Sequence, residues 1–578
     1  MKFSELSGYL HKLEITSSRI EITKILAELF KKAEPDEAAY ITYLLLGRLV
    51  PKYEAVVFNI AEKMMLASIA KAYNRPLIEV TKKYKKEGDL GTAAQSFAKV
   101  LGDGLKVKEV YKRLWSIAVD EGEGSQERKI DETAKLLSEL DPLSARYVAR
   151  IPVGKLRLGF SDKTIIDAFS WMEAGDKSLR AKIESAYQVL PDVGLLAREI
   201  KTRGIEKAVE NVTPKVGVPV LAMLAQRLKS PAEMIKKMGK VGVEPKLDGL
   251  RMQIHFKRST SSNSRGVKGE EFIKAFTRNM NETSWMFPEL DEIGKYIKAD
   301  EVILDTEAVG VNEALKAVAN FQSTMTRRRK HDIKEMAAKV RIQFYVFDIL
   351  AKDSKSLMSL KYKERKEILK DTVVGGELFK YTEYTVTDSP VEVARLNVEY
   401  RKKGFEGIMI KRLDGAYVPG RTGWRWVKMK EAEDAIGKLS DTVDCVVMGY
   451  SAGRGKRATF GLGQFLVGVR SGDRFKTISK VGTGLTDEQF RSLRKLLTKC
   501  TVPNKPEEYD VNKILEPDYW VFPEIVVEIA ADEITKSPSH TTGLALRFPR
   551  LVKFRQDKSP NEATTTLEVE KLFELYTQ

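Results

Sequence analysis

The spacing of apolar residues changes from helical to strand-like close to residue 214. Before that point apolar residues recur at helical intervals, for example Leu6, Leu10 and Leu13, and alternating β-branched runs are scarce. Residues 211–220 contain two prolines and a glycine, which interrupt the helical periodicity. Beyond them, short runs alternate apolar and polar residues like half-buried strands, mixed with helical stretches. A single helical bundle and a single sheet are both excluded, so we predict a multidomain chain.

The length of the chain agrees with this division. At 578 residues it is too long for one hydrophobic core, and length alone suggests about four domains. The pattern predicts three: an all-α domain of about ten helices at residues 1–214, an α+β domain at 215–431, and a strand-rich domain at 432–578. Short strands with glycine corners in the last region are typical of a small β-barrel of the OB type, a common binder of nucleic acid.

The charge of the chain favours a polyanionic partner. Lys and Arg number 98 against 81 Asp and Glu, which gives a net charge of +17 and a pI near 9.3. A merely solubilising charge remains the alternative. The two cysteines, Cys445 and Cys500, indicate a reducing compartment and leave no basis for a structural zinc cluster. The first residues lack a signal peptide and no apolar run reaches membrane-spanning length, so we expect an intracellular protein without a membrane partner.

The stretch Glu244–Arg251, with the sequence EPKLDGLR, carries the candidate nucleophile. Strand-like runs flank it, so Lys246 is expected between two strands at a turn eased by Gly249. Desolvation and nearby cations depress the pKa of a lysine amine, and the freed lone pair attacks a carbonyl or a phosphorus. Arg251 supplies such a cation, and Asp248 is placed to orient the amine or to contact a ribose. The pattern K-x-D-G-x-R arises by chance in about one chain in a hundred of this length, so a surface turn stays open as the alternative.

Further residues in the middle region suit phosphoryl or nucleotidyl transfer. Glu307 and Glu406 are candidate ligands for a hard divalent cation such as Mg²⁺, and Phe347 is a candidate to stack on a purine. The cations that would neutralise a polyphosphate are Arg251, Arg278, Lys411, Lys428 and Lys430. Each residue has an ordinary alternative when it is taken singly: a paired acid, a core phenylalanine or a solvated lysine.

A glycine-rich loop in the helical region is a candidate for binding DNA phosphates. Gly154, Lys155, Arg157 and Gly159 place two cations between glycines whose backbone amides can approach a partner closely. On this segment alone, an ordinary basic connection between helices is the favoured alternative. The segment Gln95-Ser96-Phe97 lacks the paired aromatics of a clamp-docking peptide, which favours a core position for Phe97.

Taken in order, these segments resemble the motifs of the covalent nucleotidyltransferases, the polynucleotide ligases and messenger-RNA capping enzymes. Residues 246–251 match the first motif, and the strand arginine Arg278, Glu307 and Phe347 match the next three. Residues 406–411 match the fourth numbered motif, and Lys428 with Lys430 match the fifth. The resemblance implies that Lys246 attacks the α-phosphorus of ATP and forms a lysine–adenylate. It also implies that Glu244 meets the adenine edge, that Phe347 stacks on the ring, and that Arg251 contacts the ribose or the nick.

The ends of the chain narrow the resemblance. The segment after residue 546 is similar to the sixth motif in its DNA-ligase form, which folds over ATP and orients the leaving pyrophosphate; it contains Arg547, Arg550, Arg555, Asp557 and Lys558. The helical region resembles the DNA-binding domain of eukaryotic and archaeal replicative ligases, and the compactness of the chain is most similar to the archaeal type. Two features differ from the family's pattern. The hairpin at residues 259–271 is longer than expected. Thr422 stands where the family usually has an arginine, and the neighbouring Arg421 is the obvious residue to take the role of that arginine.

The resemblance implies an ATP-dependent DNA ligase that seals nicks in replication, repair and recombination. Its fold would be an all-α DNA-binding domain, an α+β nucleotidyltransferase domain (ATP-grasp-like ligase domain) and an OB-fold β-barrel, encircling nicked duplex DNA. It implies ATP and Mg²⁺, with Mn²⁺ as an alternative metal, a monomer, a sliding clamp as a candidate partner, and a cytoplasmic location, or a nuclear one in a eukaryote. An RNA ligase or guanylyltransferase, and a non-catalytic DNA-binding scaffold, remain the alternatives.

Overall fold

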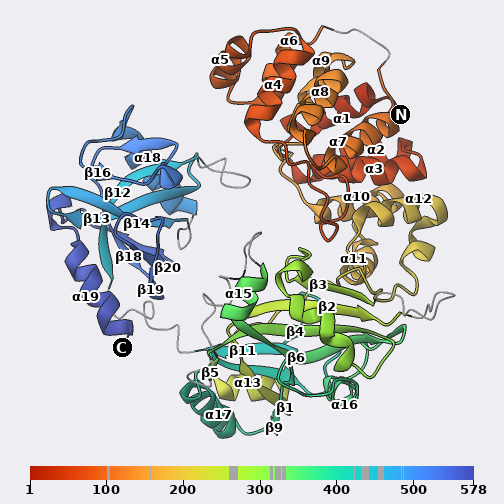
Figure 1. Ribbon diagram of the computed structural model, residues 1–578, viewed down its shortest axis with the longest axis vertical. Coiled ribbons are helices and arrows are strands. Elements are labelled where there is room, and N and C mark those ends of the chain that lie inside the picture. The colour runs from red at the N-terminus through yellow and green to blue at the C-terminus, as the bar shows by residue number, and fades with distance from the viewer. Residues whose placement is uncertain are drawn as a thin grey trace. The chain divides into compact units, whose positions relative to one another are not determined.

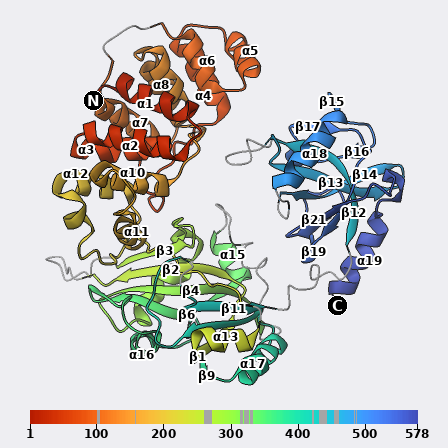
Figure 2. The same ribbon diagram turned by 180° about the vertical axis from the view of Figure 1, so that it is seen from behind.

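The computed structural model describes residues 1–99, 104–156, 158–228, 230–259, 271–312, 317–318, 327, 333–420, 423–430, 442–452, 461–482, 485 and 487–577. The chain divides into two compact units, Met1–Lys430 and Glu431–Gln578. The first unit contains a helical region followed by a mixed region of strands and helices, and the second unit is rich in strands (Figures 1 and 2).

The helical region contains twelve α-helices within the described part of residues 1–214, slightly more than predicted. They are α1 (Phe3–Ile15), α2 (Arg19–Lys32), α3 (Pro35–Leu45), α4 (Glu62–Ala72), α5 (Leu77–Glu87), α6 (Leu90–Phe97), α7 (Val107–Val119), α8 (Ser125–Ser138), α9 (Pro142–Arg150), α10 (Asp162–Ala174), α11 (Arg180–Val189) and α12 (Val193–Val209). Short helices account for the difference. Gly88 takes a left-handed conformation that ends α5, and the Asp89 side chain accepts a hydrogen bond from the Thr92 amide to begin α6.

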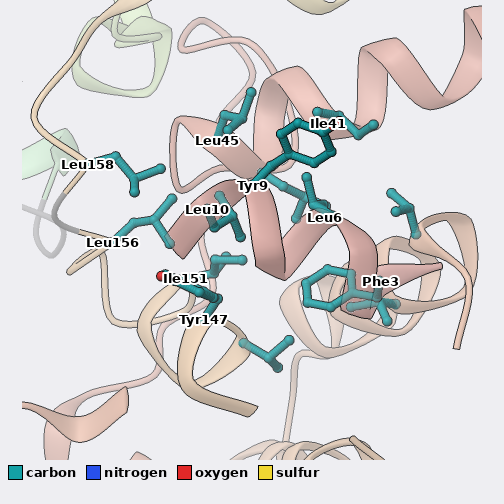
Figure 3. Packing of buried hydrophobic residues seen from close by; sticks show 14 of the residues in the cluster. Phe3, Leu6, Tyr9, Leu10, Ile41, Leu45, Tyr147, Ile151, Leu156 and Leu158 are labelled. Atoms are coloured by element: carbon teal, nitrogen blue, oxygen red, sulfur yellow. The ribbon is translucent and has the colours of Figure 1, made fainter. Parts of the chain in front are cut away.

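The apolar stripe of α1 packs within the core of the helical region, to which most of the helices contribute. Figure 3 shows Phe3, Leu6 and Leu10 of this helix among side chains from α3 and α9 and from the segment after α9. That segment contributes Leu156 and Leu158, which are 6% and 8% exposed. Full burial of a leucine stabilises the fold by about 1.5–3 kcal/mol, so this loop is anchored to the bundle by its alternate residues.

The mixed region contains two sheets whose strands are mostly antiparallel. One sheet has the order β11-β10-β1-β9, and the other has the order β3-β2-β4-β6-β7, with β5 paired to β4 and β8 paired to β6. The strands are β1 (Val241–Lys246), β2 (Leu250–Lys257), β3 (Phe272–Thr277), β4 (Glu301–Asn312), β5 (Ala317–Val318), β6 (Arg341–Lys352), β7 (Lys355–Ser356), β8 (Phe379–Tyr381), β9 (Thr385–Thr387), β10 (Gly407–Arg412) and β11 (Trp426–Lys430). The helices are α13 (Pro231–Met238), α15 (Ile333–Lys339), α16 (Tyr362–Thr372) and α17 (Pro390–Lys402), with 3-10 turns at Ser284–Met286 and Pro288–Lys295.

The turn between β1 and β2 carries the chain from one sheet to the other. Lys246 is the last residue of β1, and Leu250 is the first residue of β2. The expected turn between two strands is present, and Lys246 lies just before it, inside β1. The role of Gly249 differs from the prediction, because this residue does not have a positive φ. A Cβ atom at Gly249 would lie 2.3 Å from the Ala308 carbonyl oxygen, so glycine is needed for the close approach of the turn to β4.

The second unit is strand-rich. Its strands are β12 (Val443–Ser451), β13 (Gln464–Ser471), β14 (Arg474–Val481), β15 (Thr501–Val502), β16 (Tyr509–Asp510), β17 (Tyr519–Val521), β18 (Val526–Ala530), β19 (Glu533–Lys536), β20 (Leu544–Arg547) and β21 (Arg550–Phe554). Two helices, α18 (Asp487–Lys499) and α19 (Thr566–Thr577), and 3-10 turns at Lys513–Leu515 and Pro560–Glu562 complete it. Strand β12 pairs with β13, β17 and β18, and its apolar residues form the centre of the core.

The predicted fold class is confirmed: an all-helical region, a mixed α+β region and a strand-rich region follow one another. The predicted boundaries at 214 and 431 stay predictions, although the division between the two units falls after Lys430. Among the residues that the structure describes, no helix combines the length and apolar character needed to cross a lipid bilayer.

Candidate active site

A cavity of about 610 Å³ lies in the mixed region and is lined by residues of both sheets. The first sheet contributes Glu244, Lys246, Met409, Lys411, Trp426 and Lys428. The second sheet and its loops contribute Leu250, Arg251, Thr277, Arg278, Glu307, Phe347 and Thr382. Small-molecule sites in proteins commonly have volumes of about 300–1,000 Å³, so the cavity has room for a nucleotide.

The register of the first sheet explains why its polar residues face the cavity together. Glu244 pairs with Met409, which pairs with Lys428, and Lys411 pairs with Trp426 in the neighbouring row. Side chains two residues apart on a strand share a face, so these rows present one surface. Lys430 pairs with Gly407 in the row of Lys246, and its side chain lies outside the described part of the structure.

Lys246 stands at the end of β1 beside an acid. The backbone N–H of Glu406 donates to the Lys246 carbonyl oxygen at 2.9 Å, and this pairing brings the Glu406 carboxylate into contact with the Lys246 ammonium. Burial lowers the pKa of Lys246, while the nearby carboxylates of Glu307 and Asp248 act in the opposite direction. At neutral pH a larger fraction of this amine is therefore unprotonated than for an exposed lysine.

Glu307 lies directly opposite Arg251 in the β2–β4 ladder. Burial raises its pKa to about 7, against the lowering effect of the Lys246 and Arg251 cations. The two predicted metal-binding carboxylates, Glu307 and Glu406, thus both interact with Lys246. Within the described ranges, no three His, Cys, Asp or Glu side chains form a group that could hold a metal ion. A divalent cation here would need oxygen ligands from a substrate, as Mg²⁺ commonly takes from phosphates.

Glu244 is a buried carboxylate that contacts one hydroxyl and two ammonium groups. It accepts hydrogen bonds from the Tyr362 hydroxyl and from the Lys366 ammonium at 3.0 Å, and the Lys411 ammonium lies 2.5 Å away. Burial alone would raise its pKa, but the two ammonium groups hold the pKa below the ordinary value. Sequence reasoning missed Tyr362 and Lys366, because they lie on α16, more than a hundred residues away, and carry no local motif.

Arg251 is bound to an acid of its own sheet. Its guanidinium donates to Asp305 at 3.0 and 2.7 Å and to the Met223 carbonyl oxygen at 2.7 Å. The Tyr417 hydroxyl donates to the same carboxylate at 2.8 Å. The predicted contact of Arg251 with a ribose or a nick is untested, and its side chain is held by these groups. Asp305 and Tyr417 were not predicted; the only signal was that Asp305 precedes Glu307 by two residues.

The aromatic wall of the cavity contains Phe347 and Trp426. Their rings meet edge to face with centroids 5.9 Å apart, and the Arg251 guanidinium lies 5.5 and 5.2 Å from the two centroids. Phe347 lines the cavity, and its stacking on a purine stays a prediction. Trp426 lines the cavity but was not predicted as a site residue, although its strand was. Arg278 lines the cavity after β3, and Arg421 lies outside the described residues.

The predicted DNA-binding loop lies after α9. Gly154 and Gly159 have φ values of +66° and +71°, a conformation that strongly favours glycine. The ammonium of Lys155 forms an ion pair with Glu62 of α4. Arg157 lies outside the described residues, as does the basic loop of residues 453–457. Phe97 is half-buried against the helical core, with the Arg75 guanidinium 5.8 Å from its ring.

The basic residues predicted near the end of the chain form ion pairs within the second unit. Arg547 pairs with Glu533 at 3.1 Å, and Arg550 pairs with Asp532 at 2.7 Å. Asp444 binds both Arg555 and Lys558, at 3.0 and 2.6 Å, and Asp557 also binds Arg555 at 2.8 Å. These side chains are thus held on the surface of their own unit by acids.

Comparison with known proteins identifies the family. Three family models match: "DNA ligase N terminus" at residues 2–170, "ATP dependent DNA ligase domain" at 222–430, and "ATP dependent DNA ligase C terminal region" at 458–558. A "Probable DNA ligase" of Dictyoglomus thermophilum is 40% identical over 584 residues, which cover 99% of this chain and 97% of the relative. A "DNA ligase" of Aeropyrum pernix is 35% identical over 609 residues, which cover 100% and 98%.

A solved structure titled "Pmar-Lig_PreS3" has a TM-score of 0.54 and 19% identity, and the match covers 95% of this chain and 99% of that one. At this identity the likeness shows the fold alone, and it agrees with the order of regions described above. The full-length identity and the three family models carry the assignment. This chain belongs to the family of ATP-dependent DNA ligases.

Proposed function

We propose that this ligase seals nicks in duplex DNA through an AMP group carried on Lys246. One observation carries the proposal. A half-buried lysine contacts a carboxylate at the edge of a nucleotide-sized cavity whose wall holds an aromatic ring and several cations. A ligase that activates a phosphate through a covalent lysine–nucleotide bond needs this combination of groups.

In the first step, the unprotonated Nζ of Lys246 attacks the α-phosphorus of ATP. A nitrogen–phosphorus bond forms, the bond to the bridging oxygen breaks, and pyrophosphate leaves. The Lys246 ammonium already contacts Glu406, so the proton lost by the amine has an acceptor within the site. Lys411 and Lys428 line the cavity and would offset the negative charge of the phosphates.

In the second step, the 5′-phosphate of the nick attacks the phosphorus of the AMP group, and Lys246 leaves as the amine. In the third step, the 3′-hydroxyl attacks the activated 5′-phosphate, and AMP leaves as the strand is sealed. The role of this chain is to position the reacting groups and to stabilise the charge on the transferred phosphorus.

Mg²⁺, with Mn²⁺ as the alternative, would be held by Glu307 and Glu406 together with phosphate oxygens of the substrate. The placement of the two carboxylates supports this assignment, because Glu307 lines the cavity and Glu406 contacts Lys246. When bound, the metal would neutralise the charge that develops on the phosphates.

Nicked duplex DNA would be held by the helical region and the second unit. Gly154, Lys155 and Gly159, with Arg157, are the proposed phosphate contacts of the helical region, and the basic segment 547–558 is proposed for the second unit. Such contacts give affinity without reading the base sequence. We also propose that the enzyme acts as a monomer; a contact with a sliding clamp remains a candidate without an assigned residue.

The experiment that tests the proposal is ligation of nicked duplexes. Purified enzyme is given ATP, Mg²⁺ and a nick with a labelled 5′-phosphate, in DNA or in RNA. We expect sealing of the DNA nick, with loss of sealing in Lys246→Ala. The matched control is Lys257→Ala, which removes an exposed lysine that pairs with Glu301 at the far end of β2. Sealing by Lys246→Ala would contradict the proposal, and sealing of RNA alone would favour an RNA ligase.

A further inference from the structure

The segment at residues 217–226, here called the connecting segment, leads from the helical region into the mixed region and belongs to no named helix or strand. Two of its residues, Leu224 and Ala225, line the candidate nucleotide cavity. Val220 and Met223 are each 2% exposed and pack in one apolar cluster with the aromatic wall of the cavity. The position of the connecting segment therefore affects both the lining of the cavity and the side chains behind it.

One face of β2 carries a row of polar side chains. Residues two apart on a strand share a face, so Arg251, Gln253 and His255 lie together and are here called the polar row. The opposite face of β2 is apolar and packs in the core of its sheet. Gln253 and His255 are 6% and 0% exposed. Buried polar groups of this kind need hydrogen-bond partners, and the connecting segment provides them.

Gln253 pairs with both backbone groups of Val220. The Val220 N–H donates to Oε1 of Gln253 at 2.9 Å, and Nε2 of Gln253 donates to the Val220 carbonyl oxygen at 2.7 Å. A neighbouring antiparallel strand would provide the same two hydrogen bonds. Because Val220 is buried, loss of the amide would leave a donor and an acceptor of the backbone without water to replace it.

The two other members of the polar row hold the connecting segment on either side of this pair. The Gly217 N–H donates to Nδ1 of His255 at 3.1 Å, and Arg251 donates to the Met223 carbonyl oxygen at 2.7 Å. Burial lowers the pKa of His255 to about 3, so the ring is neutral at ordinary pH and Nδ1 can accept. Gln253 is thus the middle one of three attachment points, and the residues that line the cavity include Arg251 but not Gln253.

Beyond the polar row, the connecting segment is attached to the first sheet. The Gln226 N–H donates to the Trp426 carbonyl oxygen at 2.8 Å, and the Lys428 N–H donates to the Gln226 carbonyl oxygen at 3.0 Å. The segment therefore runs from β2 in one sheet to β11 in the other. Leu224 and Ala225 lie between these two attachments, so their position in the cavity depends on both.

We propose that Gln253 is a positioning residue for the formation of the protein–AMP adduct: its amide fixes the connecting segment, which places Leu224 and Ala225 against the bound nucleotide. The inference rests on the proposed function, because it takes ATP to occupy this cavity. Gln253 acts through the segment and does not contact the nucleotide. Loss of its amide therefore weakens the binding of ATP more than it slows the chemistry at Lys246.

The test measures KM for ATP and kcat in the formation of the protein–AMP adduct. Gln253→Met keeps the length of the side chain and removes both hydrogen bonds to Val220. We expect KM to rise about tenfold while kcat changes less than about twofold. The matched control is Lys129→Met, which removes two buried hydrogen bonds to the Phe58 and Ala118 carbonyl oxygens in the helical region, at 2.9 and 3.2 Å. This control should lower the unfolding temperature and leave KM unchanged.

Gln253→Glu adds a pH-dependent readout. A protonated carboxyl group offers one donor and one acceptor, as the amide does, whereas a carboxylate cannot donate to the Val220 carbonyl oxygen. Burial and Asp305, which lies opposite residue 253 in the β2–β4 ladder, favour the protonated form, and Arg251 favours the ionised form. We expect KM close to that of the wild type at low pH and a ratio of the two KM values that rises with pH. For Gln253→Met this ratio should be the same at every pH.

The possible outcomes separate positioning from a general loss of stability. An unchanged KM in Gln253→Met overturns the inference, as does an equal rise of KM in Lys129→Met. A raised KM ratio for Gln253→Glu that is the same at every pH also overturns it, and this variant decides the question if Gln253→Met does not fold. Absence of any adduct in the wild-type enzyme would instead contradict the proposed function.

Discussion

Lys246 and Glu307 form a coupled pair of titrating groups. Burial lowers the pKa of the lysine and raises that of the carboxyl to about 7, so burial disfavours the charged form of each. The charge of each group partly offsets this effect on the other. The charge on Glu307 therefore affects how readily Lys246 loses its proton.

The pH dependence of the first chemical step should report this coupling. At saturating ATP, the rate of protein–AMP formation is expected to rise with pH, with a midpoint below the ordinary lysine value of 10.5. Glu307→Gln removes a negative charge that raises the pKa of Lys246, so its midpoint should lie at lower pH than that of the wild type. Rapid-quench kinetics across the pH range measures both midpoints. A midpoint that is unchanged or higher in the variant would show that the two groups do not interact.

The same variant makes a prediction about stability. Unfolded Glu307 loses its proton near pH 4.5, whereas the folded residue keeps it to about pH 7. Because the folded pKa is raised, the contribution of Glu307 to stability is fully present below pH 4.5 and is lost as pH rises through 7. Relative to wild type, Glu307→Gln should gain unfolding free energy on the order of 3 kcal/mol between about pH 5 and about pH 8. Urea denaturation of both proteins measures the difference in unfolding free energy. A difference that does not change with pH would be inconsistent with a carboxyl group whose pKa is raised in the folded protein.

At the scale of elements, the site depends on how β1, β2 and β4 meet. The β1–β2 turn passes so close to β4 that a Cβ at Gly249 would lie 2.3 Å from the Ala308 carbonyl oxygen and 3.0 Å from the Glu307 Cγ. Neither strand can move away easily, since β2 and β4 pair along eight residues from Leu250 to Lys257. The turn therefore fixes the separation between Lys246 and Glu307.

Gly249→Ala tests this close approach. The added methyl should displace the turn or β4, with a loss of about 1–3 kcal/mol in unfolding free energy and a slower formation of protein–AMP. Gly375→Ala is the matched control in the same region, because a Cβ there meets no atom within 4 Å and its φ is not positive. Thermal unfolding and adduct formation are compared for the two variants. Equal stability and equal rates of adduct formation in the two variants would mean that the turn can accommodate a Cβ atom at residue 249.

Local pattern was enough to predict the strands around the site. The strand-like runs expected on either side of Lys246 correspond to β1 and β2, because short apolar or alternating runs are typical of strands. The contacts that hold the site residues were not predictable in this way. Glu244 is held by α16 and Arg251 by Asp305, and such partners depend on how the sheets are arranged in space.

The number of helices and the role of Gly249 show the same limit. Within the described part of residues 1–214, twelve helices replace the expected ten or so, because several of them are short, such as α6 with 8 residues and α9 with 9 residues. Gly249 was interpreted as a residue needed for its backbone conformation, whereas the structure requires it for space. A sequence marks where glycine is needed, but only the packing shows which property of glycine is used.

At the scale of the whole molecule, the net charge of +17 is the property that bears most directly on DNA. Affinity that comes from phosphate contacts falls steeply with salt, because bound counterions are released from DNA. If about six phosphates are contacted, affinity for nicked duplex should fall by about a thousandfold between about 50 and 200 mM salt, with little dependence on base sequence. Fluorescence anisotropy with two nicked duplexes of unrelated sequence tests both statements. An affinity insensitive to salt would point to base contacts instead.

The central claim is that Lys246 carries AMP covalently, and it is tested most directly with ATP labelled at the α-phosphate. Enzyme and Mg²⁺ are incubated with this ATP or with equally labelled GTP, and the denatured protein is examined for bound label and mapped by peptide mass spectrometry. The account predicts label from ATP on the peptide that contains Lys246, absent in Lys246→Ala, retained in Lys257→Ala and released by nicked duplex DNA as the strand is sealed. Label on another residue, label from GTP alone, or no label at all would contradict it.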